Sequence, residues 1–212
     1  MLKLKAALAA TLALAITACA REGDIFETGV LTTYTACPAV AIAAPTGDVT
    51  LFNPPASRDA AAIDVVANIA NVQSSCSETG EFIVTNVTFD VQAQRRDPRG
   101  TRDLVLPYYA TVVQAGQNVV AKQVGQVALR FPEGQLRASG RAQATTQVLR
   151  SAATLPEEIR RQITRHRRPG DADAAIDPLA DPAVRAAVER ARFEVLIGFQ
   201  LDQEQLRYNA TR

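Results

Sequence analysis

Few residues of this 212-residue chain could carry out catalysis, because it contains one histidine, three cysteines and no tryptophan. Any Ser-His-Asp or Cys-His mechanism would need His166 as its general base. This histidine lies in the run Arg165-His166-Arg167-Arg168, where the neighbouring positive charge disfavours the imidazolium that such a mechanism forms. We therefore interpret His166 as a solvated surface residue.

Metal and cofactor chemistry have equally little support. One histidine and three cysteines cannot supply the ligands of a structural zinc site if the cysteines are modified or paired. Asp171, Asp173 and Asp177 could converge on calcium, but the spacing lacks the full EF-hand ligand series and its terminal glutamate. No glycine-rich nucleotide-binding motif is present. The sequence therefore predicts no metal, no cofactor and no catalytic residue.

The densest charged feature is a group of five arginines. Guanidinium groups bind phosphates and carboxylates in a bidentate manner, so these residues are candidate contacts for an anionic polymer or a protein partner. The alternative is a solvated helix face, paired with Glu157, Glu158 and the aspartates that follow. Over the whole chain, 23 Lys+Arg balance 22 Asp+Glu, which argues against a nucleic-acid binder. The five residues are Arg160, Arg161, Arg165, Arg167 and Arg168.

The N-terminus has the features of a secretory signal. Lys3 and Lys5 precede an apolar stretch at 6–16, which is too short to span a bilayer. The stretch ends in Ile16-Thr17-Ala18-Cys19, which resembles the bacterial lipobox. On this interpretation 1–18 is a signal peptide and Cys19 carries the lipid that anchors the protein to the membrane. Ordinary cleavage after Ala20 is the alternative.

The remaining cysteines, Cys37 and Cys76, would then form a single pair in an oxidising compartment. We predict a disulfide between them. The alternative, two free thiols with a redox role, would normally show the closer C-x-x-C spacing.

Residues 19–35 have little periodicity and are interpreted as a tether, and 36–212 as one domain. Within the domain, apolar and polar residues alternate with period two, which is typical of strands with one face in a core. About seven such strands predict an antiparallel β-sandwich of immunoglobulin or fibronectin type III character, and a closed barrel with a ligand cavity is the alternative. The expected strands are 48–52, 63–73, 87–93, 104–113, 118–130, 136–144 and 193–201. Because adjacent strand residues point to opposite faces, one of Tyr108 and Tyr109 is expected in the core.

Residues 151–192 break this pattern and predict a helical insertion before the last strand. Thr154 and Glu157 resemble a capping box for a first helix with Ile159 and Ile163 on one face. Asp181-Pro182 is typical of the start of a second helix, which has an apolar stripe at Val184, Ala187, Val188 and Ala191. Asp202 and Gln205 resemble a further capping box near the C-terminus.

The segment Phe193-Glu194-Val195-Leu196-Ile197-Gly198-Phe199-Gln200-Leu201 is followed by Leu206 and Tyr208-Asn209. Shorter segments are Cys37-Pro38, Ser75-Cys76-Ser77, Val120-Ala121-Lys122-Gln123 and Phe131-Pro132. Together they resemble a family of small proteobacterial outer-membrane lipoproteins. The resemblance implies an outer-membrane location and a sandwich fold, and it carries over no catalytic residue.

We therefore expect a lipid-anchored, non-enzymatic protein on the outer membrane, facing the periplasm. It would act through contacts with an envelope protein or an anionic envelope polymer, for example as an accessory subunit of an outer-membrane assembly. The alternative is a periplasmic carrier with a small-molecule cavity between its sheets. An enzyme of this composition would be a carboxylate-based hydrolase, which needs two convergent acids in one cleft.

Overall fold

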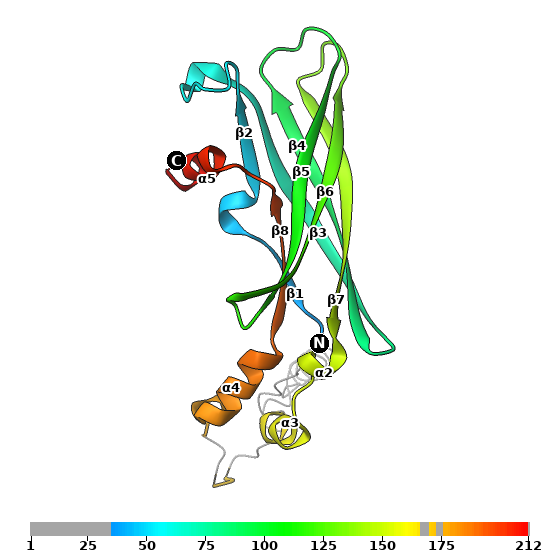
Figure 1. Cartoon of the computed structure of the whole chain (residues 1–212), viewed down its shortest axis with the longest axis vertical. Coiled ribbons are helices and arrows are strands. Elements are labelled where there is room, and N and C mark those ends of the chain that lie inside the picture. Colours follow the sequence, from blue (N-terminus) through cyan, green and yellow to red (C-terminus); the bar gives the residue numbers. More distant parts are fainter. Residues whose placement is uncertain (1–34, 166–169, 173–175, 212) are drawn as a thin grey trace, which may run out of the picture.

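The computed structural model describes residues 35–165, 170–172 and 176–211. It is a β-sandwich of eight strands in two four-stranded sheets (Figure 1). Sheet A has the strand order β1-β8-β5-β6, and sheet B has the order β2-β3-β4-β7. The strands are β1 (Ala39–Ile42), β2 (Asp48–Phe52), β3 (Ile63–Thr79), β4 (Phe82–Arg95), β5 (Arg102–Gln114), β6 (Asn118–Phe131), β7 (Arg137–Leu149) and β8 (Phe193–Phe199).

All neighbouring strands pair in antiparallel fashion except β1, which runs parallel to β8. The predicted sandwich is confirmed, with one strand more than the alternation indicated. That strand is β1, which is four residues long and largely exposed, so it shows no alternation between apolar and polar residues. It could not be found from periodicity alone.

The main core lies between the sheets and consists of alternate side chains from both. Phe89 of β4, Phe131 of β6 and Ile197 of β8 are almost completely buried. Tyr108 points into this core, where it packs edge-on against Phe89 and donates a hydrogen bond to the Gln143 carbonyl oxygen. Tyr109 points to the outer face of sheet A, so the prediction that one of the two tyrosines is buried is confirmed.

The helical insertion lies between β7 and β8, as predicted, and extends from one end of the sandwich (Figure 1). It comprises α2 (Arg150–Ala153), α3 (Glu157–Thr164), the short helix η4 (Pro178–Ala180) and α4 (Pro182–Ala191). A second, separate core forms within it. This core contains Leu155, Ile163, Val184, Ala187 and Ala191.

Of the three predicted helix starts, two are confirmed and one is wrong. Asp181 caps α4 by accepting from the Ala183 amide, as expected. Asp202 and Gln205 form the predicted capping box of α5 (Gln203–Thr211), since each side chain accepts from the other's backbone amide. The capping box at Thr154 is wrong: its hydroxyl donates to the Arg150 carbonyl oxygen, and α3 begins after Pro156 without a side-chain cap. Pro156, which fixes an extended entry into the helix, explains the difference.

Two short helices complete the fold, η2 (Ala44–Thr46) between β1 and β2 and η3 (Ala60–Ala62) before β3. Among the described residues, no helix combines the length and the apolar character needed to cross a bilayer.

Candidate interaction surfaces

The structure describes three of the five predicted arginines, Arg160, Arg161 and Arg165. Arg160 and Arg161 lie on α3, and both form ion pairs with Glu157 on the preceding turn, at 3.4 Å for Arg161. Arg165 follows the helix as its C-cap, whereas Arg167 and Arg168 lie outside the described residues. For the arginines on α3, the pairing favours the solvated helix face over a free anion-binding cluster.

The predicted disulfide is confirmed. The Sγ atoms of Cys37 and Cys76 lie 2.05 Å apart, with a Cα–Cα distance of 6.0 Å. Cys37 precedes β1 of sheet A and Cys76 lies on β3 of sheet B, so the bond ties the two sheets together. The predicted lipid-attachment residue Cys19, like His166, lies outside the described residues.

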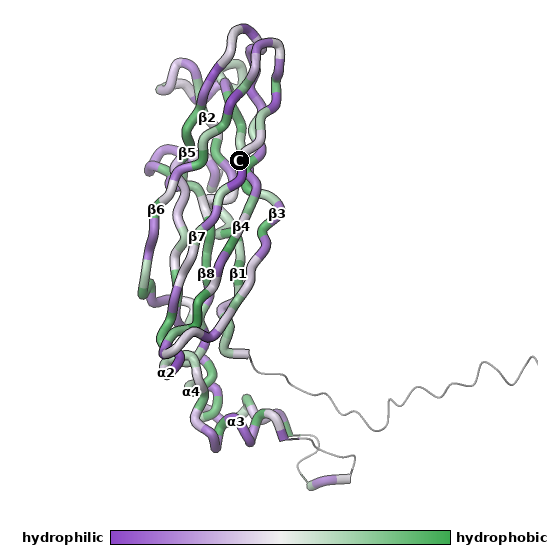
Figure 2. The backbone as a smooth tube through the Cα atoms, turned by 90° about the vertical axis from the view of Figure 1, so that its right-hand side faces the viewer, coloured by the Kyte–Doolittle hydropathy of each residue, from purple (hydrophilic) through white to green (hydrophobic). Residues whose placement is uncertain are grey.

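The first half of β6, one of the two edge strands of sheet A, exposes several apolar side chains. We call residues 118–126 the β6 edge. Its three valines, Val119, Val120 and Val124, are 64%, 50% and 60% exposed. Among the strands that the structure describes, β6 pairs only with β5, and it runs along one margin of the molecule (Figure 2). Sequence alternation predicted this strand but could not show that it lies at an edge.

Sheet B approaches β6 only further along the strand. A Cβ atom on Gly140 of β7 would lie 2.9 Å from the Ala128 carbonyl oxygen, so β7 approaches closely there. The β6 edge precedes this point, and its residues are all exposed except Gly125, which is partly buried. Its outward-facing amide and carbonyl groups therefore have no strand partner within the described chain.

Beside the β6 edge, a hollow of about 370 Å³ opens on the outer face of sheet A. The strand register sets its floor, because Lys122 lies opposite Thr111, which in turn lies opposite Leu196. The Lys122 ammonium lies 5.1 Å from the centre of the Tyr109 ring. Leu201 and Leu206 extend the apolar wall of the hollow.

The η2 turn packs tightly against this face. The Thr46 and Tyr109 hydroxyl oxygens are 2.8 Å apart and hydrogen-bonded. A Cβ atom on Gly198 would lie 2.0 Å from the Thr46 hydroxyl oxygen, so only glycine fits there. These contacts fix the position of the η2 turn on the outer face of sheet A.

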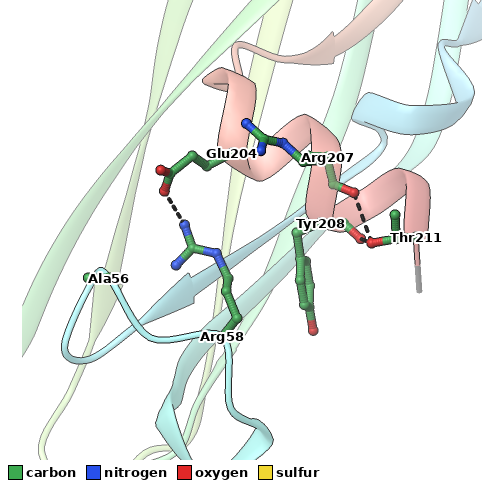
Figure 3. A pocket seen from close by; sticks show the side chains of 6 residues that line it. All are labelled: Ala56, Arg58, Glu204, Arg207, Tyr208 and Thr211. Atoms are coloured by element: carbon green, nitrogen blue, oxygen red, sulfur yellow. Dashed lines mark hydrogen bonds and ion pairs between the residues drawn. The ribbon is translucent and has the colours of Figure 1, made fainter.

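A second hollow, of about 390 Å³, lies between the β2–β3 loop and α5 (Figure 3). Its one carboxylate, Glu204, accepts a 2.5 Å hydrogen bond from Arg58, whose guanidinium also lies 5.1 Å from the Phe52 ring centre. Tyr208 packs edge-on against Phe52. The adjoining hollow of about 360 Å³ adds Asp64 and Asp202, of which Asp64 is ion-paired with Arg102 and Asp202 caps α5.

Elsewhere, individual acids are held by individual arginines. The Arg99 side chain, through its hydrogen bonds, lowers the pKa of Asp97 to about 2. Hydrogen bonds from Arg141 and Asn71 lower the pKa of Asp90. Within the described ranges, no three His, Cys, Asp or Glu side chains gather in a way that could hold a metal ion.

Comparisons with protein-family models, with curated proteins and with solved structures found no match. The function must therefore be inferred from the surfaces of the molecule.

Proposed function

We propose that this chain is a lipid-anchored, non-enzymatic envelope protein that faces the periplasm from the outer membrane. It acts by binding a protein partner, as an accessory subunit of an envelope assembly. The lipobox at Ile16-Thr17-Ala18-Cys19 supports the anchor, and the β6 edge is the observation that supports the partner.

The β6 edge combines the unpaired main-chain groups of any edge strand with exposed apolar side chains, which natural sheets usually avoid there. It has unpaired main-chain groups, and it exposes Val119, Val120 and Val124 to water. An extended segment of a partner would satisfy the main-chain groups by adding a strand to sheet A. Its side chains would cover the valines and could enter the neighbouring hollow. Lys122, on the same strand, would favour an acidic residue in that segment.

A second copy of the chain fits this edge less well than a different protein. Antiparallel pairing of two β6 strands would turn one copy end over end relative to the other. The two N-terminal ends would then point in opposite directions, so one tether would have to run back along its sandwich to reach the membrane.

The test is affinity capture from crosslinked envelopes. It compares the unchanged chain with a variant that carries a charge on the β6 edge. Val124→Asp should abolish recovery of the partner, because a carboxylate would lie where the apolar contact forms. The matched control is Val105→Asp on β5, since Val105 is 52% exposed and lies opposite Ala128, outside the β6 edge. It should leave recovery unchanged.

The proposal would be overturned if Val124→Asp and Val105→Asp recovered the partner equally well. It would also be overturned if the unchanged chain captured no reproducible partner. The anchor is tested separately by mass spectrometry of the mature N-terminus. A diacylated Cys19 is expected, and an unmodified N-terminus at Arg21 would refute the anchor.

The carrier alternative has no observation in its favour. It needs a cavity between the sheets, and side chains such as Phe89, Phe131 and Ile197 fill that space.

A further inference from the structure

The outer face of sheet B differs in chemistry from that of sheet A. We call the outward-pointing residues of β3, β4 and β7 the polar face. Strand register places them in seven rows of three, and only Asp90, Arg137 and Arg141 among them are charged. The rows are Val66-Gln94-Arg137, Asn68-Gln92-Ser139, Ala70-Asp90-Arg141, Gln73-Thr88-Gln143, Ser75-Asn86-Thr145, Ser77-Val84-Gln147 and Thr79-Phe82-Leu149.

The first two rows line a hollow of about 520 Å³. Neighbouring strands are about 4.8 Å apart, and alternate residues along a strand about 7 Å apart, so the side chains form a regular grid. Three carboxamides, from Asn68, Gln92 and Gln94, face this hollow together with the Ser139 hydroxyl. Each carboxamide can both donate and accept hydrogen bonds.

The hollow also contains one cation, Arg137, and the apolar side chains of Val66, Ala93 and Ala138. Arg137 forms no ion pair with any described residue, in contrast to Arg141 in the next row, which binds Asp90 with an Nε to Oδ1 distance of 2.9 Å. Asp90 in addition accepts a hydrogen bond from Asn71. The Arg137 guanidinium is therefore available for an external carboxylate. Val66, 38% exposed, offers a small apolar contact at the other end of its row.

We propose that this hollow binds an acidic glycan, a sugar chain that carries carboxylates. Carboxamides, a serine hydroxyl and a guanidinium match the hydroxyl and carboxylate groups of such a chain, and Val66 matches the C–H face of a sugar ring. One free cation is too few to hold a polyphosphate.

The polar face is also long enough to bind a polymer. Beyond the Asp90–Arg141 pair, three further rows continue along the same strands with mainly Gln, Asn, Ser and Thr side chains. From Gln94 to Val84 of β4 this track covers about 34 Å at the usual rise per strand residue. This site is independent of the protein contact at the β6 edge, which lies on the other sheet.

The test uses the full chain with Cys19→Ser and isothermal titration calorimetry. The probes are tetragalacturonate, which is acidic, and chitotetraose, which is neutral. We expect saturable binding of tetragalacturonate, at least tenfold weakened by Arg137→Gln, and weaker binding of chitotetraose. Arg130→Gln, which removes an exposed arginine of sheet A, is the matched control and should bind like the unchanged chain.

Absence of saturable binding, or equal affinity of the Arg137→Gln variant and the unchanged chain, would overturn the proposal. Co-sedimentation with purified peptidoglycan sacculi and with lipopolysaccharide then separates the two envelope sources of acidic sugars. Retention by either that is lost in Arg137→Gln supports the site, whereas retention by neither contradicts an envelope ligand. Val124→Asp should not affect any of these measurements, so this proposal and the proposed protein contact can fail separately.

Discussion

Arg95 is an almost fully buried arginine, 2% exposed, that holds two loops together. Its guanidinium donates to the carbonyl oxygens of Pro98 and Gly100 after β4 and of Pro132 and Gln135 after β6. It also lies 5.3 Å from the centre of the Phe131 ring. The loops at this end of the sandwich therefore depend on one side chain.

Replacing Arg95 with methionine should lower the free energy of unfolding by about 3 kcal/mol, because the two loops lose all four hydrogen bonds from this buried side chain. Arg95→Lys should be only partly tolerated, since an ammonium cannot reach all four acceptors. Urea denaturation measures both changes. Arg130→Met, at a side chain that is 73% exposed, is the control and should change stability by less than about 0.5 kcal/mol. An equally small effect at Arg95 would contradict this account.

Asp90 provides a test of pH dependence on the polar face. Its pKa is lowered because Arg141 and Asn71 donate hydrogen bonds to the carboxylate. A lowered folded-state pKa stabilises the fold above the unfolded value, and this contribution is lost as the pH falls through the folded value. Arg141→Gln should therefore raise the pKa of Asp90 towards the usual value of an aspartate. An NMR titration of the carboxyl carbon measures the shift, and no movement would refute the assigned cause.

Among the elements, the disulfide joins the start of sheet A to the long strand β3 of sheet B. It links residues that are 39 positions apart in the sequence. The chain-entropy treatment gives about 4 kcal/mol for a loop of this length. Cys37→Ala combined with Cys76→Ala should therefore lower the free energy of unfolding by a comparable amount in urea. Reductant should lower the free energy of unfolding of the unchanged chain to that of the double variant. If the two still differed under reducing conditions, the loss of stability in the double variant would not come from the disulfide alone.

Period-two alternation predicted seven of the eight strands because each has one face in the inter-sheet core. It missed β1, which has no buried face to produce a pattern. The disulfide was predictable because only two cysteines remained after the lipobox. The interaction surfaces could not be predicted from the sequence. Val119 is exposed because β6 lies at an edge of sheet A, and Arg137 is available because no acidic side chain among the described residues pairs with it. The arginine cluster was conspicuous in sequence, but Glu157 neutralises part of it one turn away.

At the scale of the whole molecule, the helical insertion and the start of the domain lie at the same end. Ala39, the first residue of β1, pairs with Glu194 at the start of β8, directly after the insertion. A tether from Cys19 to Thr35 could span at most about 55 Å. With the proposed anchor, the tether would leave the sandwich at this end, and the β6 edge and the polar face would lie along its sides.

The insertion has its own core, separate from the one between the sheets. Val184 of α4 is 1% exposed at the centre of this smaller core. Val184→Asp would place a carboxylate among apolar side chains and should unfold the insertion alone. Hydrogen exchange should then show loss of protection for the amides of α3 and α4, with those of β3, β4 and β5 unchanged. The exposed neighbour Arg185→Asp is the control and should leave both regions protected. Loss of protection across the sheets in Val184→Asp would mean that the two cores fold as one unit.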